Sequence, residues 1–176
     1  MQSTKASLRY AKAVFEIAQS KGVEDKVFED LNNIRHEINR KTELFYLIKD
    51  PTIKCQNKIT LFKKVFETKT DPLTMQFLIL VLTKNREFQL VHMIDKYEEL
   101  YNKKKGISVL EVVSSEPLGD TMKEAIKLKI KPGKQVKFKE TIDKSLLGGF
   151  IVNSEGLQYD ASIRKKINNI KRAFKL

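Results

Sequence analysis

A chain of 176 residues corresponds to one or two domains, and its 34 Lys and Arg against 22 Asp and Glu give a formal net charge of +12. Its 41% hydrophobic residues can form a core, but no run of about 18 apolar residues could span a bilayer. One cysteine and two distant histidines exclude an internal disulfide and leave no ligand cluster for zinc, while the positive charge could attract nucleic acid or an anionic membrane.

The chain begins without the apolar segment of a secretory signal, so we expect the mature protein to start near Met1. Apolar residues at three- and four-residue spacing then predict a first helix that ends near Gly22. Tyr10, Val14 and Ile17 form a second stripe on the same helix, which is therefore apolar on more than one side. The first stripe consists of Leu8, Ala11, Phe15 and Ala18.

Three further segments before residue 70 have helical character. Apolar spacing predicts a second helix along 27–38 and a fourth along 55–66. The short apolar piece 44–48 between them predicts a third helix, which stops at Asp50-Pro51 because proline disfavours helix in the residue before it.

Asp71 and Pro72 predict the start of a fifth helix. The side chain of Asp71 can accept a hydrogen bond from an unpaired backbone amide of the first turn, and Pro72 occupies a position that needs no amide donor. The six residues 77–82 are all apolar, and a helix that is apolar all round is buried or covers a partner. A sixth helix ends at the lysines before Gly106, with Leu90, Ile94, Tyr97 and Tyr101 on one face.

After Gly106 the hydrophobic period changes from about 3.6 to about 2, which places a domain boundary there. Residues 1–105 are predicted to be all-helical, and residues 106–176 to form a small α/β domain. We expect strands along 107–113, 136–142, 146–152 and 157–159, and a helix around 122–129. Asp160 is expected to cap a last helix whose apolar face comprises Ile163, Ile167, Ile170 and Phe174.

The sequence contains little that indicates catalysis. It lacks a Gly-rich loop ending in Gly-Lys-Ser or Gly-Lys-Thr, which argues against nucleotide hydrolysis. Gly148 and Gly149 could bring amides close to an anion, but a bulge or close backbone packing is favoured within a strand pattern. Asp143 and Asp160 could form an acid–base pair, although both occupy positions where aspartate is favoured for local hydrogen bonds. We therefore expect no catalytic residues, cofactor or metal.

The positive charge is shared between the two parts of the chain. Residues 1–105 carry 20 basic and 14 acidic residues and residues 106–176 carry 14 and 8, so each part contributes +6. Acids are interleaved with most of these bases, which is typical of a solvated surface. The last helix is the exception, because six bases follow Asp160 without an acid, and this surface could meet an acidic protein, lipid headgroups or nucleic acid.

Three stretches resemble the ATP synthase delta family, whose mitochondrial members are called oligomycin-sensitivity-conferring proteins. The segment 9–18, Arg-Tyr-Ala-Lys-Ala-Val-Phe-Glu-Ile-Ala, is similar to the family's opening helix. Residues 77–86 resemble its fifth helix and the following turn. The most specific stretch, 142–150 continued by 160–167, resembles its C-terminal signature, although Ala161 stands where glycine is frequent.

The resemblance implies a non-catalytic stator subunit of the proton-translocating rotary ATP synthase. Its fold would be an N-terminal six-helix bundle followed by a small C-terminal α/β domain. In the family the bundle sits on the catalytic head and holds the N-terminal helix of an alpha subunit against its first and fifth helices. The smaller domain meets the peripheral stalk, which is formed by b subunits. We expect no nucleic-acid partner and membrane association only through the complex, on the cytoplasmic face of a bacterial plasma membrane.

Two docking surfaces follow as hypotheses. The groove for the helix of the alpha subunit is predicted to be lined by Tyr10, Val14, Ile17, Phe77, Leu78 and Val81. All six could instead be internal bundle core, since such stripes are often simply buried. For the stalk we predict the basic face of the last helix, with Arg164, Lys165 and Lys171, as complementary to an acidic stalk terminus. The alternative function is a basic nucleic-acid- or ribosome-associated binding protein.

Overall fold

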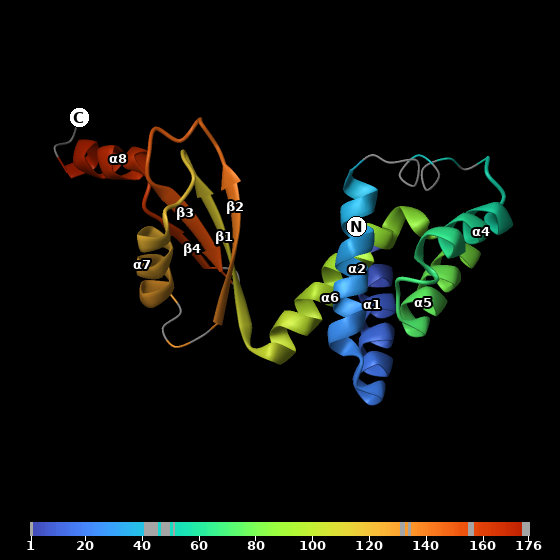
Figure 1. Ribbon diagram of the computed structural model, residues 1–176. Helices are drawn as coiled ribbons and strands as arrows, with labels where there is room; N and C mark the ends of the chain where they lie inside the picture. The colour runs from blue at the N-terminus through green and yellow to red at the C-terminus, as the bar shows by residue number, and fades with distance from the viewer. Residues whose placement is uncertain are drawn as a thin grey trace. The chain divides into compact units, whose positions relative to one another are not determined.

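The computed structural model describes residues 2–40, 46, 50, 52–130, 133, 135–154 and 157–173. The chain divides into two compact units, Met1–Tyr101 and Asn102–Leu176 (Figure 1). The division falls in the last helical turns before Gly106, close to the position where the hydrophobic period changes. The first unit is helical, and the second combines a four-stranded sheet with two helices.

The helical unit contains five described α-helices and a short 3-10 helix. The predicted third helix, residues 44–48, lies outside the described residues except for Tyr46, so the described part of the chain does not reveal a sixth α-helix in this unit. The elements are α1 (Gln2–Lys21), α2 (Glu24–Asn39), α4 (Cys55–Phe66), α5 (Pro72–Thr83), η1 (Glu87–Gln89) and α6 (Leu90–Lys105).

The predicted start of α5 is confirmed in detail. The backbone amide of Leu73 donates a 2.8 Å hydrogen bond to Asp71 Oδ1, and Pro72 occupies the first helical position. A second carboxylate, on the buried Asp30 of α2, accepts from the amide of Asp71 at 2.7 Å and from the hydroxyl of Thr74 at 3.1 Å. The first turn of α5 is thereby tied to α2, which fixes the side of α5 that faces the core.

The core of the helical unit contains most of α5 and the first stripe of α1 except Leu8, which is exposed. Ala11, Phe15 and Ala18 are buried, and Phe15 packs edge-on against Tyr97 of α6 at a ring distance of 5.4 Å. Helix α2 is joined to α6 by Arg35, which donates to Asp95 at 3.1 Å and to Glu98 at 2.7 Å. These contacts join α6 to both α1 and α2.

The second unit has a sheet in the order β2-β1-β3-β4. Its strands are β1 (Ile107–Ser114), β2 (Gln135–Ile142), β3 (Phe150–Ser154) and β4 (Leu157–Asp160), and its helices are α7 (Asp120–Ile130) and α8 (Ile163–Ala173). The β1–α7–β2 segment is a crossover that pairs β1 and β2 in parallel, with Ile107 opposite Gln135. The β1–β3 and β3–β4 pairs are antiparallel.

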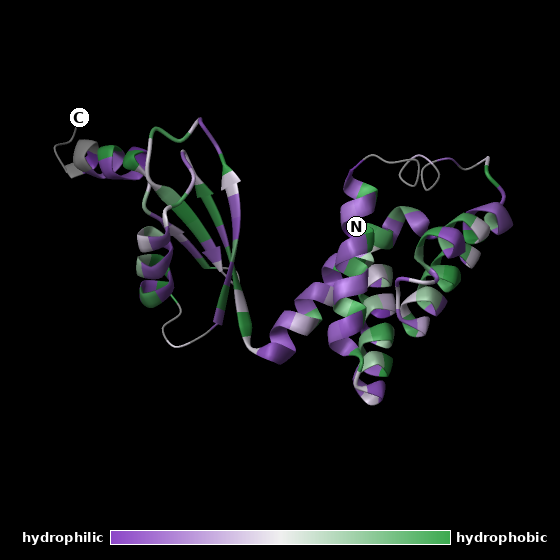
Figure 2. Ribbon diagram, viewed as in Figure 1, coloured by the Kyte–Doolittle hydropathy of each residue, from purple (hydrophilic) through white to green (hydrophobic). Residues whose placement is uncertain are grey.

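The core of this unit is small. Leu110, Val112 and Val152 of the central strands are buried with Ile126 of α7. Figure 2 shows α8 with both hydrophilic and hydrophobic bands. No helix within the described residues is both long enough and apolar enough to cross a membrane.

Two local predictions for this unit were wrong. The third strand begins at Phe150 rather than Leu146, because residues 146–149 form bends around the two glycines. The cap of α8 is Ser162, whose hydroxyl accepts from the amide of Lys165 at 3.2 Å. Asp160 instead closes a turn one step earlier, accepting from the amide of Ser162 at 2.8 Å.

Candidate docking surfaces

Most of the residues predicted to line the groove in the helical unit are buried. Val14, Phe77, Leu78 and Val81 have exposed fractions of 7%, 4%, 0% and 0%, and all four belong to the core. Only Ile17, at 44%, is exposed, while Tyr10 is partly buried. The physical reason is that the core surrounds more than half of α5, so the long apolar run is used inside the unit.

The exposed stripe of α5 lies on the opposite side from these buried residues. Leu80 is 46% exposed and shares the outer stripe with Gln76 and Thr83, which are also exposed. Gln76, four residues before Leu80, and Thr83, three residues after it, mark the face of α5 that meets solvent. These two polar residues were the signal in the sequence that could have identified Leu80 as exposed. Sequence reasoning missed this residue because the run of apolar neighbours hid the stripe.

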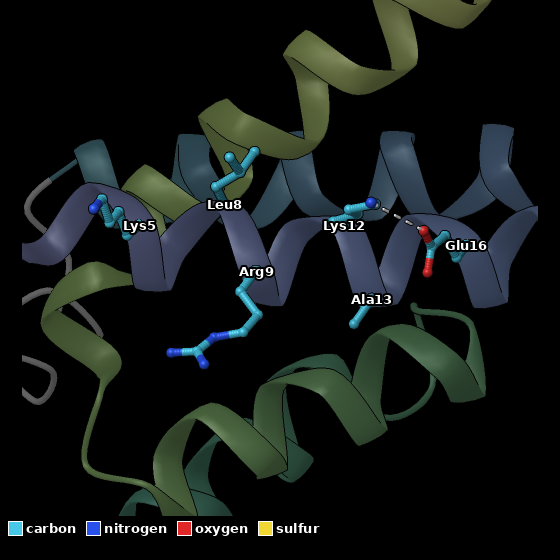
Figure 3. Close-up of a pocket in the computed structure, with 6 residues that line it drawn as sticks. All are labelled: Lys5, Leu8, Arg9, Lys12, Ala13 and Glu16. Carbon is cyan, nitrogen blue, oxygen red and sulfur yellow. Dashed lines mark ion pairs between the residues drawn. The ribbon is translucent and has the colours of Figure 1, made fainter.

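The outer face of α1 combines apolar and basic residues. An open pocket of about 410 Å³ lies along this helix. In Figure 3, Arg9 and Ala13 point toward α5 and Leu8 points to the other side. Leu8 is 45% exposed. An ion pair of 3.7 Å joins Lys12 to Glu16 at the far end. The pocket is lined by Lys5, Leu8, Arg9, Lys12, Ala13 and Glu16.

Two contacts at the end of α5 hold the adjoining turn in place. The guanidinium of Arg86 lies 5.6 Å from the ring centroid of Tyr10, a cation–π contact that joins this turn to α1. Lys58 of α4 and Glu87 of η1 form a buried ion pair with Nζ and Oε1 at 2.6 Å. The outer faces of α1 and α5 are therefore fixed relative to each other at this end.

The basic residues of α8 whose side chains the structure describes lie on the surface, as their predicted role requires. Arg164 donates a hydrogen bond to the carbonyl oxygen of Ser145 at 3.3 Å, and Lys165 is exposed. The side chain of Lys171 lies outside the described residues. Nearby, Lys129 donates to the hydroxyl of Tyr159 at 2.8 Å and lowers the pKa of that phenol, with further contributions from lysine charges on α8. The positive potential on this side of the unit is thus shared by α7 and α8.

An apolar stripe runs along α8 beside its basic face. Ile163 and Ile167, four residues apart, are 42% and 40% exposed. Leu147, in the loop that is hydrogen-bonded to the start of α8, is 70% exposed. The predicted Ile170 and Phe174 belong to the same spacing, but their side chains lie outside the described residues. The stripe is therefore a second candidate docking surface.

Asp143 and Asp160, the possible carboxylate pair, each accept a hydrogen bond from a nearby backbone amide. The amides of Ser145 and Ser162 donate to Asp143 and Asp160 at 2.9 and 2.8 Å, and each bond holds the pKa of its carboxyl below the usual value. A general acid needs a raised pKa, so this arrangement does not suit acid catalysis. Within the described residues, no three His, Cys, Asp or Glu side chains come together as a metal site.

Comparison with known proteins gives a consistent picture. The family model described as ATP synthase delta (OSCP) subunit matches residues 6–174. ATP synthase subunit delta of Flavobacterium psychrophilum is 34% identical over 175 residues, with 98% of each chain covered. The subunit delta of Parvibaculum lavamentivorans is 35% identical over 170 residues, covering 95% of this chain and 88% of that relative. A chain in the cryo-EM structure of the Toxoplasma gondii mitochondrial ATP synthase hexamer shares the fold, with a TM-score of 0.76, 22% identity and 97% of each chain covered.

Proposed function

Because the chain belongs to the ATP synthase delta (OSCP) family, we propose that its helical unit binds the catalytic head and its sheet unit binds the peripheral stalk. The chain is a non-catalytic component of the ATP synthase peripheral stalk. The observation that carries the proposal is the extent of the family match, which includes both units from residue 6 to residue 174.

The proposed task is to resist torque. Proton flow turns the central rotor, and the catalytic head would turn with it unless it were held to the static membrane sector. A tether needs a firm contact at each end, and burial of apolar surface provides one that depends little on salt. The two units, each with its own core, supply two separate docking surfaces on one chain.

At the head, the proposed partner is the N-terminal helix of an alpha subunit, laid along the outer faces of α1 and α5. An amphipathic helix docks through residues at spacings of three, four and seven, which suit a line of exposed apolar side chains. Ile17 and Leu80 supply exposed apolar surface, with Tyr10 and Ala13 beside Ile17 on α1. The buried residues predicted for this groove form its supporting layer.

Titration calorimetry with a peptide from the N-terminus of the alpha subunit of the same organism tests this surface. The double variant Ile17→Asp/Leu80→Asp should lose at least about tenfold in affinity, because two charges would be desolvated beneath the peptide. Leu61→Asp is a matched control, since Leu61 is 41% exposed on α4 of the same unit. Undiminished peptide binding by the folded double variant would refute the assignment.

At the stalk, the proposed partners are the b subunits, bound by α8. The apolar stripe of Ile163 and Ile167 would supply buried area, and Arg164, Lys165 and Lys171 would face acidic residues. Reversing one charge with Lys165→Glu should weaken stalk binding and reduce its dependence on salt. Measuring the affinity of this variant for the b subunits at two ionic strengths tests this prediction. An unchanged salt dependence would contradict the proposed electrostatic contribution of α8 to stalk binding.

The segment 44–48 would supply the sixth helix of the bundle. Carbon chemical shifts typical of a helix for these residues would support this, and shifts typical of extended backbone would disprove it.

In the cell, the protein would lie on the cytoplasmic face of a bacterial plasma membrane as part of the complex. Fractionation tests this placement, because release from washed membranes should require conditions that detach the catalytic head. The nucleic-acid-binding alternative is not favoured by the family match.

A further inference from the structure

Helix α8 is held in an unusual way within the described part of its unit. Every described side chain from Ile163 to Asn169 is exposed, including both isoleucines of the apolar stripe. An isolated helix of its 11 residues would be marginal, because nucleation is costly and helices shorter than about 12 residues rarely persist alone in water. Among the described residues, the hydrogen bonds that attach α8 to the rest of the unit lie at its first turn.

Backbone hydrogen bonds provide that attachment. The antiparallel pairing of β3 and β4 continues past the end of β4, where the amide of Ala161 donates to the carbonyl of Phe150 at 2.9 Å. The amide of Ile163, the first residue of α8, donates to the carbonyl of Gly148 at 3.0 Å. The first bond extends the β3–β4 pairing to the residue before the helix cap, and the second satisfies one of the unpaired N-terminal amides of α8.

Gly149 lies between these two bonds, where the loop passes close to the backbone of residues 161–162. A Cβ at this position would be 2.5 Å from the carbonyl oxygen of Ala161 and 3.0 Å from Cα of Ser162. Both are backbone atoms, so they can move aside only if the start of α8 moves. At Gly148 the nearest atom is instead the Cδ1 end of the Ile163 side chain, which is exposed and can rotate.

We propose that Gly149 is a positioning residue, which sets the direction of α8 and thereby presents the stripe of Ile163 and Ile167 to the stalk. The missing side chain lets the loop lie directly on the backbone of residues 161–162, and the helix follows from that contact. This role explains Gly149 without an anion ligand. The stalk-binding part of the inference rests on the proposed function.

Gly133 provides a matched control. It has φ +75°, close to the +81° of Gly149, but a Cβ there would meet nothing within 4 Å. Gly133→Ala and Gly149→Ala therefore share the strain of a left-handed alanine, and only the second adds the backbone clash. If Gly149→Ala does not fold, the pair Gly149→Asn and Gly133→Asn replaces it, because asparagine tolerates positive φ and still has a Cβ.

The experiment measures the direction of α8 and stalk binding in the same full-length variants. Spin labels at Thr141 and Arg172, in a Cys55→Ala background, report the distance between β2 and α8 by electron spin resonance. Substitution at position 149 should shift or broaden this distance and weaken binding to the C-terminal segment of the b subunits at least tenfold. Substitution at position 133 should do neither.

The outcomes separate this inference from the proposed function. If position 149 gives the same distance distribution as position 133, Gly149 does not set the helix direction. If the direction changes but stalk affinity does not, the inference is also wrong. In that case Ile163→Asp/Ile167→Asp decides the proposed function separately, because weaker binding by that variant supports the α8 surface and full binding overturns it.

Discussion

Lys58 and Glu87 show how a single buried contact can fix a surface several residues away. Their side chains are only 4% and 5% exposed, and Glu87 Oε2 has no hydrogen-bond partner within the described structure. A buried pair is costly to desolvate, so its presence is better explained by placement than by net stability. It fixes the turn after α5, next to the residue that contacts Tyr10.

Removing one member of this pair should be much worse than replacing both. Lys58→Met leaves Glu87 buried without a counter-charge and should lower the free energy of unfolding by about 3 kcal/mol. The double variant Lys58→Met/Glu87→Met should recover most of that loss, since two apolar side chains fill the same space. Urea denaturation measures both, and equal losses in the single and double variants would show that the pair does not act as a unit.

The carboxylates of the sheet unit predict loss of stability in acid. A hydrogen bond from Lys123 lowers the pKa of Glu140, and backbone amide bonds lower those of Asp143 and Asp160. Because the folded pKa values are lowered, the stabilisation is fully present above the unfolded pKa values of about 4 and is lost as pH falls through the folded pKa values.

Asp160→Asn tests one of these contributions. The amide oxygen of asparagine can still accept from the Ser162 amide, but it does not titrate, so the sheet unit should depend less steeply on pH below about 4. Urea denaturation followed by the NMR signals of β3 and β4 reports the change. An acid dependence identical to that of the unchanged protein would contradict the assigned role of this carboxylate.

At the scale of residues, the sequence pattern correctly predicted Asp71 as the cap of α5, but the prediction of Asp160 as the cap of α8 was wrong. Asp71 precedes a proline, and this combination leaves one consistent helix start. Before α8, Asp160 and Ser162 can both accept an amide hydrogen bond, and the pairing of Ala161 with Phe150 determines where the helix begins. That pairing is a tertiary contact between segments that are separate in the sequence, so the local sequence pattern could not predict it.

At the scale of elements, α5 illustrates what an apolar run can and cannot reveal. The run correctly predicts a helix with an unusually large buried face, but it does not indicate which side is turned inward. That side is chosen by the contacts of Asp30 with Asp71 and Thr74. Val81 is consequently fully buried and its neighbour Leu80 is 46% exposed.

Two adjacent substitutions test the orientation of α5. Val81→Asp should destabilise the helical unit by several kcal/mol, because the charge would be buried without a partner. Leu80→Asp should change stability by less than about 1 kcal/mol, as is usual for exposed positions. Thermal unfolding of both variants compares them directly, and comparable destabilisation would mean that α5 is rotated from the orientation described.

The exposure of the α8 stripe leads to a similar contrast in the sheet unit. Ile167→Asp should leave the free protein almost as stable as before, since its side chain is 40% exposed. Ile126→Asp, on α7, should unfold the unit because that side chain is 3% exposed within the small core. Hydrogen exchange in β1 and β3 measures the difference, and strong protection in the Ile126 variant would contradict the described core.

At the scale of the whole molecule, the sequence indicates a two-part chain and the family that it resembles. The change of hydrophobic period near Gly106 is visible because helices and strands repeat their apolar residues differently. The sheet order and the exposed stripes could not be predicted, since they depend on which faces pack against each other. The comparisons cover both units, and thus link this division to a component of the peripheral stalk.

The most direct test of a two-ended tether is capture of ATP synthase subunits from native membranes by tagged full-length variants. Ile17→Asp/Leu80→Asp should retain the b subunits and lose the catalytic head, whereas Ile163→Asp/Ile167→Asp should retain the head and lose the b subunits. Head and stalk are captured separately after mild dissociation of the complex, so that each contact is measured alone. Loss of the same partner by both variants, or of neither partner by either, would contradict the assignment of one end of the tether to each unit.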